Sequence, residues 1–142
     1  MNAKLIIATL ITAVVNFLLG WLVFGLLLMD FYTANTTHYD GLMKEMPNLL
    51  FIFLSGLLYA FLLAFIFDRW AGIRNFRKGF TAGLLLGFLI MTGFDLYFLA
   101  GMNLFNARVV IVDIIVNTIF GGILGGVTGL VLGFGRKSAA IE

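Results

Sequence analysis

The sequence contains no cysteine, a single histidine and a single proline among its 142 residues. Without cysteine, the chain has no disulfides, no thiol nucleophile and no thiolate metal site. The histidine, His38, lies in a predicted loop, so one chain cannot supply two histidines to a haem or to a metal ion inside the membrane. The motifs typical of zinc proteases, serine hydrolases and P-loop nucleotide-binding proteins are absent from the sequence. We therefore expect a protein that is not an enzyme and that has no metal and no cofactor.

Charged residues are also scarce. They make up 11% of the chain, whereas a soluble domain has about 25% charged residues. Hydrophobic residues make up 62%, against roughly 45–50% in a soluble domain. So short a chain cannot bury that much apolar surface in a water-soluble core, and the surplus must face lipid. The basic residues are distributed as membrane topology requires, which argues against a nucleic-acid partner. The sequence thus predicts a single transmembrane domain over residues 1–142, with membrane lipids as partners.

Four apolar runs are long enough to cross a bilayer, which takes about 20 helical residues. They cover approximately residues 5–29, 49–67, 80–102 and 109–134. They are apolar on all sides rather than alternating, which favours helices over the strands of a barrel. The first run is too long for the apolar part of a cleaved signal peptide, about 7–15 residues, so we expect it to be retained. The predicted fold class is all-α, an integral membrane four-helix bundle.

The positive-inside rule gives this bundle an orientation. Seven basic residues flank the spans on one side and two on the other. The first group contains Lys4, Arg69, Arg74, Arg77, Lys78, Arg136 and Lys137, and the second contains Lys44 and Arg108. Both termini and the loop 68–79 are therefore predicted to be cytoplasmic, and the loop 30–46 to face outward. The expected location is the inner (cytoplasmic) membrane of a bacterial cell, as a multi-pass protein.

The cytoplasmic loop has two interpretations. Its basic residues and its tryptophan suit an anionic lipid headgroup, and the candidate residues are Arg69, Trp70, Arg74, Arg77 and Lys78. Topology alone also requires a basic loop at this position, and this simpler interpretation is favoured.

Glycine is abundant, with 17 residues, and it recurs every four residues in the last two spans. Small residues at this spacing let helix backbones approach closely in lipid. We expect Gly83 and Gly87 to pack against Gly121, Gly125 and Gly129 in a hairpin. The last span has glycine on more than one face, which suggests a second stripe for another subunit. The sequence thus favours a homo-oligomer or a subunit of a membrane complex.

Two acidic residues, Asp95 and Asp113, lie inside spans, where charge is costly and usually faces the bundle interior. Both are predicted in the outer half, at similar depths on adjacent antiparallel helices. Arg108 is long enough to reach either carboxylate and to offset the cost of desolvation. Further polar groups extend the predicted cluster on the same helix faces or toward mid-membrane, namely Thr92, Asn117 and Asn16.

This polar cluster has a structural and a functional interpretation. In the first, the groups hydrogen-bond across the bundle, each bond contributing roughly 0.6 kcal/mol. In the second, they line a polar cavity that binds a cation, a proton or a small solute. The structural interpretation is favoured, because four helices enclose little volume.

Three segments carry a resemblance to known proteins. They are Asn16-Phe17-Leu18-Leu19-Gly20-Trp21, then Gly83-Leu84-Leu85-Leu86-Gly87-Phe88 with Gly93-Phe94, and the turn ending in Arg108 with Asn117 and the last glycines. In these features the chain resembles a family of small bacterial four-span membrane proteins known as a domain of unknown function. The resemblance covers most of the chain and implies the topology but no activity. Asp95 departs from the family pattern.

The sequence therefore favours a structural or accessory membrane protein that acts through helix packing and through oligomer or partner contacts. The alternative is a small ion, proton or solute transporter or channel with a polar cavity around Asp95 and Asp113.

Overall fold

The computed structural model describes residues 3–135, and within them four helices are long and apolar enough to cross a membrane. They cover Ala3–Leu27, Leu49–Ala71, Phe76–Gly101 and Ala107–Gly133. The predicted all-α, four-helix arrangement is confirmed. These four spans identify the chain as a multi-pass membrane protein. Arg136 and Lys137, which contribute to the predicted orientation, lie outside the described residues.

The helices differ from the predicted spans mainly at their ends. The first span consists of α1 (Ala3–Leu22) and a π-helical turn, η1 (Val23–Leu27), and a short helix, α2 (Met29–Asn35), follows within the predicted loop. The second consists of α3 (Leu49–Phe65) and a second π-helical turn, η2 (Ile66–Ala71). The third and fourth are α4 (Phe76–Gly101) and α5 (Ala107–Gly133).

Asparagine caps determine where the last three long helices begin. In each case the asparagine side chain accepts a hydrogen bond from a backbone N–H in the first turn, which would otherwise lack a partner. The pairs are Asn48 with Phe51, Asn75 with Lys78 and Asn106 with Val109, at 3.3, 2.9 and 3.0 Å. The cap at Asn75 explains why α4 begins before the apolar run that predicted it.

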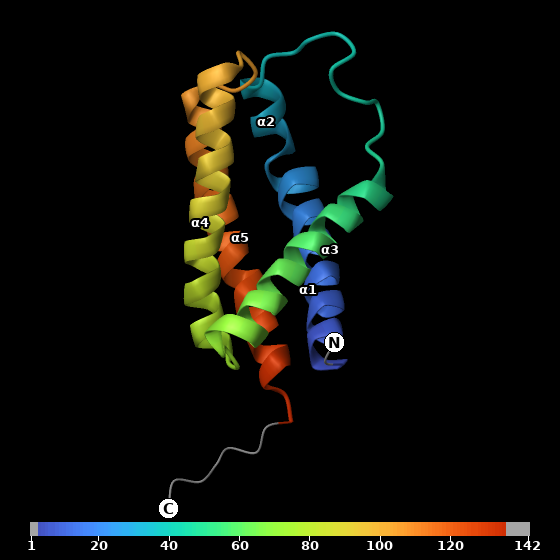
Figure 1. Cartoon of the computed structure of the whole chain (residues 1–142). Helices are drawn as coiled ribbons and strands as arrows, with labels where there is room; N and C mark the ends of the chain where they lie inside the picture. The colour runs from blue at the N-terminus through green and yellow to red at the C-terminus, as the bar shows by residue number, and fades with distance from the viewer. Residues whose placement is uncertain (1–2, 136–142) are drawn as a thin grey trace, which may run out of the picture.

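Helix α5 lies at the centre of the bundle, packed against α4 along one side and against α1 on another (Figure 1). Helix α3 crosses α1 obliquely and also contacts α5. We call the end that holds residue 3, the α3–α4 connection and residue 135 the termini end, and the opposite end the loop end. At the termini end, Lys4 Nζ donates to the backbone carbonyl of Phe134 at 2.8 Å.

Glycines face one another between α4 and α5. Gly79, Gly83 and Gly87 of α4 lie against Gly121, Gly125 and Gly129 of α5, and we call this contact the glycine seam. A methyl group added at Gly83 would lie 2.9 Å from Gly125 Cα, and one added at Gly121 would lie 2.8 Å from Gly87 Cα. Real Cβ atoms do not approach so closely, so the two backbones can pack in this way only without side chains.

The second glycine face of α5 is also occupied within the chain. A Cβ at Gly122 would meet Leu84 at 2.9 Å, and one at Gly126 would meet the ring of Phe76. These side chains come from α4. The face that the sequence suggested for another subunit is therefore filled by the hairpin partner itself.

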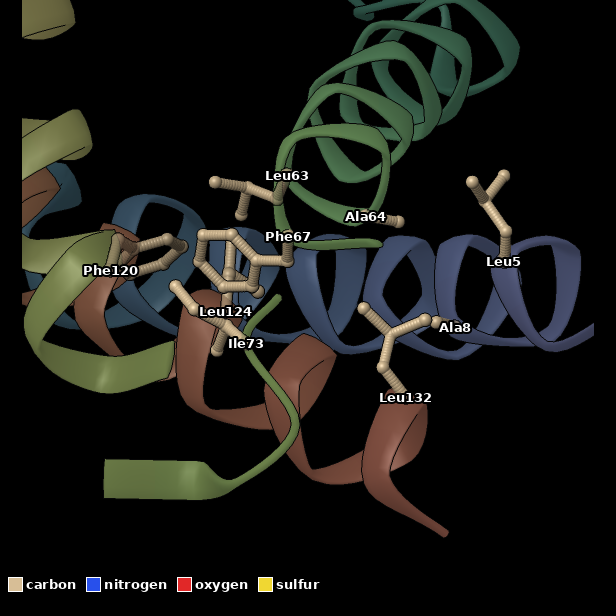
Figure 2. Close-up of a cluster of buried hydrophobic side chains, with 9 residues drawn as sticks. All are labelled: Leu5, Ala8, Leu63, Ala64, Phe67, Ile73, Phe120, Leu124 and Leu132. Carbon is tan, nitrogen blue, oxygen red and sulfur yellow. The ribbon is translucent and has the colours of Figure 1, made fainter. Parts of the chain in front are cut away.

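An apolar core occupies the termini half of the bundle, where α1, α3, η2 and α5 meet (Figure 2). Its members are Leu5, Ala8, Leu63, Ala64, Phe67, Ile73, Phe120, Leu124 and Leu132. One hydrogen bond joins α1 to α5 nearby, between the hydroxyls of Thr12 and Thr128 at 2.9 Å. Both side chains are fully buried. Because the Thr128 hydroxyl also lies 2.7 Å from the carbonyl of Leu124, to which it donates, Thr12 is the donor between the helices.

Candidate functional site

The loop end is built around α2. The turn η1 and the irregular residue Leu28 separate α2 from α1. Asn106 Nδ2 donates to the carbonyl of Asn35 at 3.0 Å, and the backbone N–H of Thr37 donates to the carbonyl of Leu104 at 2.8 Å. These bonds attach the end of α2 to the turn between α4 and α5. A π-helical turn inside a longer helix often marks a functional site.

Asp113 on α5 has a hydrogen-bond donor on each carboxylate oxygen. The Tyr32 hydroxyl of α2 donates to Oδ1, and Asn117 Nδ2, one helical turn along α5, donates to Oδ2 at 2.6 Å. Phe24 of η1 lies between Tyr32 and Phe120, with ring centroids 5.7 Å apart in each pair. The bend after α1 therefore places the tyrosine over the acid of α5.

The Tyr32 hydroxyl is a donor at all ordinary pH values. Burial raises the pKa of Tyr32 above its usual value, and its hydrogen bond to Asp113 and the nearby carboxyl charges raise it further. The tyrosine therefore keeps its proton and continues to donate it to Asp113.

Asp95 of α4 lines one cavity of about 220 Å³ together with Tyr32 and Asp113. Phe98, Phe105, Val109 and Val110 form its apolar walls. Among the described residues, Asp95 Oδ2 is buried without a hydrogen-bond partner, and so is the hydroxyl oxygen of Thr92 one turn away. A buried polar atom without a partner is costly, and such atoms are rare in folded proteins.

The structure does not bring Arg108 into this cluster. Arg108 is exposed, and no ion pair joins it to Asp95 or Asp113 in residues 3–135. The predicted cluster of Asp95, Arg108 and Asp113 is therefore not formed. Residues share a helix face at spacings of three or four, and Arg108 precedes Asp113 by five, so the two side chains leave α5 in different directions.

Asn16 lies apart from the two acids. It lines a second cavity, of about 450 Å³, between α1, α3 and α5, together with Ser55 and Asn117. Its amide nitrogen packs directly over Gly56 of α3, where there is no side chain to displace it. Ser55 lies on the exposed side of α3 and bonds within its own helix, to the carbonyl of Ile52 at 2.8 Å. Asn117 thus belongs to both sites.

The candidate lipid-binding residues fall into two groups. Arg74 Nη2 lies 2.6 Å from Asp68 Oδ1, and its guanidinium also donates to the carbonyls of Phe67, Asp68 and Ile73. Arg74 therefore holds the connection between η2 and α4 in place through these hydrogen bonds. The other basic side chains and the tryptophan are exposed at the termini end, namely Arg69, Trp70, Arg77 and Lys78.

Two residues of the polar contacts were not predicted as partners. Tyr32 is one of them, because nothing in the sequence indicates that α2 folds over α5. Thr128 is the other, and the signal for it is a hydroxyl among the glycines of an otherwise apolar stretch of α5.

Comparison with protein family models, curated proteins and solved structures finds no match to this chain. The similarity to a family of four-span proteins therefore remains a resemblance in sequence motifs.

Proposed function

We propose that the chain is a small membrane transporter or channel component that binds a proton or a small monovalent cation between Asp95 and Asp113. The observation that carries the proposal is the buried Asp95 Oδ2, which has no partner in the described residues although it lines the same cavity as Asp113. Two carboxyl groups in one apolar cavity repel each other when both are ionised. A bound proton or cation would remove that repulsion, and no basic side chain lines the cavity to do so.

The two acids would have different roles. Asp113 already receives hydrogen bonds from Tyr32 and Asn117, which stabilise a carboxylate. Asp95 is the acid with an unoccupied oxygen, and it would hold the exchangeable ion. Ionisable residues inside spans are in general associated with ion and proton pathways.

The proposed orientation would place this cavity in the outer half of the membrane. Seven basic flanking residues against two support cytoplasmic termini in the inner membrane. Lys4 and three exposed basic residues, Arg69, Arg77 and Lys78, lie at the termini end. The loop end, with the acidic cavity, would then face outward.

The test uses the full chain in liposomes that contain a pH-sensitive dye. We expect a proton gradient to dissipate faster with the parent protein than in empty liposomes, and Asp95→Asn to abolish the difference. Asp40→Asn is the matched control, because it removes one acid from a fully exposed loop position. A sodium gradient, followed with a sodium dye, separates the two candidate ions. If neither gradient responds to the parent protein, the proposal is wrong.

The second candidate is a structural or accessory role, without catalysis, that depends on helix packing. The glycine seam and the Thr12–Thr128 bond support it, because they fix one arrangement of α1, α4 and α5. In this case Asp95→Asn and Asp113→Asn would change the melting temperature while no ion flux occurs in the parent protein.

Partners are proposed on separate grounds. The exposed group of Arg69, Trp70, Arg77 and Lys78 suits anionic lipid headgroups at the termini end. A homo-oligomer or a larger membrane complex is still proposed, but it would need a surface other than the two glycine faces of α5. Crosslinking in the membrane would test this assembly.

A further inference from the structure

The cavity beside Asn16, between α1, α3 and α5, is distinct from the acidic one. Its volume of about 450 Å³ is within the range of small-molecule sites, roughly 300–1,000 Å³. Aromatic rings form much of its wall, from Phe17, Trp21, Phe24 and Phe120. Trp21 is 61% exposed and Ile52 45%, so the cavity opens on the surface of the bundle that faces lipid. An occupant would enter from the membrane.

The polar groups of this cavity are uncharged. They are the amides of Asn16 and Asn117, the hydroxyl of Ser55 and the indole N–H of Trp21, and no acidic or basic side chain lines the wall. Asn117 donates to Asp113, and the Ser55 hydroxyl bonds to its own helix. None of the side-chain hydrogen bonds within residues 3–135 involves the Asn16 amide, whose nitrogen lies against Gly56. A neutral ligand with a hydrogen-bond acceptor would satisfy it.

The depth of Asn16 narrows the class of ligand. Asn16 lies next to the middle residue of the span Ala3–Leu27, and Asn117 within one helical turn of the middle of Ala107–Gly133. The hydrocarbon core is about 30 Å thick, so the ester carbonyls of glycerolipids lie roughly 15 Å from this level. Among membrane lipids, an acceptor at this depth belongs to one that carries its polar group inside the bilayer.

We infer that this cavity binds a neutral lipid with a planar, carbonyl-bearing ring, the chemistry of a lipid quinone. The ring carbonyl accepts a hydrogen bond from the Asn16 amide. The aromatic wall packs against the ring, and the tail leaves through the opening beside Trp21 into lipid. The inference does not rest on the proposed ion site and requires no ion flux, although Asn117 belongs to both sites.

Trp21 provides the readout. The chain has two tryptophans, and the other, Trp70, is exposed at the termini end. In a Trp70→Phe background, Trp21 is the single tryptophan reporter. We expect decylubiquinone, added to the full chain in nanodiscs, to quench Trp21 fluorescence along a saturable curve. Phosphatidylcholine brominated on its chains should quench without saturation.

Two glycines offer a matched pair of variants. A Cβ at Gly20 meets nothing within 4 Å, and Gly20 lines the cavity. Gly93 on α4 is equally free of neighbours within 4 Å but does not line the cavity. Gly20→Leu should fill the cavity and weaken decylubiquinone binding by at least about tenfold, while Gly93→Leu leaves it unchanged. Asn16→Leu should weaken binding by about fivefold.

Melting temperatures of both glycine variants establish that each is folded. Quenching that is linear in the parent protein, or equal in Gly20→Leu and Gly93→Leu, would overturn the inference. Saturable quenching by the brominated phospholipid without competition from decylubiquinone would overturn it as well, since the occupant would then be an ordinary acyl chain.

Discussion

The two halves of the bundle are stabilised by different means. In the termini half, α4 and α5 meet through glycine backbones, and a dense apolar core joins α5 to α1 and α3. In the loop half, polar contacts connect α2 to α5 beside the acidic cavity. The comparison indicates that glycine backbones and apolar side chains hold the termini half together, whereas polar contacts hold the loop half. Such a division should be visible in the effects of substitutions.

The largest effect is expected in the glycine seam. Gly83→Leu places a side chain where even a Cβ would lie 2.9 Å from Gly125 Cα. The two helices must separate, and we expect a loss of roughly 3 kcal/mol or more of unfolding free energy. Unfolding in mixed detergent micelles measures it. Gly93→Leu is the control, and equal stability of the two variants would show that the seam does not hold the hairpin.

A smaller effect is expected at the loop end. Tyr32→Phe removes the hydrogen bond to Asp113, and we expect a loss of about 1.5 kcal/mol near neutral pH. The pKa of Tyr32 is raised in the folded protein, so the unfolded chain loses this proton first, near the ordinary tyrosine pKa. The contribution of Tyr32 is therefore fully present below about pH 10 and is lost as the pH rises further.

Unfolding curves recorded from neutral pH to above pH 10 test the direction of this pH dependence. The difference between the parent protein and Tyr32→Phe should shrink above pH 10. Tyr97→Phe is the matched control, because Tyr97 is 71% exposed. A difference that grows with pH would contradict the buried tyrosine donor.

The smallest effect is expected between α1 and α5. Thr12→Val keeps the shape of the side chain and removes the bond to Thr128, whose hydroxyl still donates to Leu124. Hydrogen bonds between membrane helices contribute about 0.6 kcal/mol on average. We expect a loss of that size in the same micelle assay, against no change for Thr81→Val, whose hydroxyl bonds only within α4. A loss comparable to that of Gly83→Leu would mean that polar contacts also hold the termini half.

The sequence predicts the spans well because membrane insertion depends on local composition. An apolar run of sufficient length must form a helix in lipid, whatever it packs against. The spacing of four also indicates which glycines share a helix face, and the α4–α5 contact follows that spacing. The loop end is different, because its contacts depend on how separate segments meet.

Individual residues of the candidate site illustrate this limit. The spacing of Asp113 and Asn117 indicates their bond, since both lie on one helix. The bond from Tyr32 depends on the π-helical turn before α2, and no local pattern predicted that turn. The predicted ion pair of Arg108 depends on the length of its side chain. It fails because that side chain leaves α5 in a different direction from Asp113.

The glycine seam has a consequence for how this protein can change over evolutionary time. A damaging enlargement in an ordinary core can be compensated by a smaller residue across the contact. In the seam the facing residue is already glycine, so the opposite helix has no side chain left to reduce. Suppressors of a Gly83 or Gly121 substitution should therefore be reversions, or changes elsewhere that move α4 as a whole.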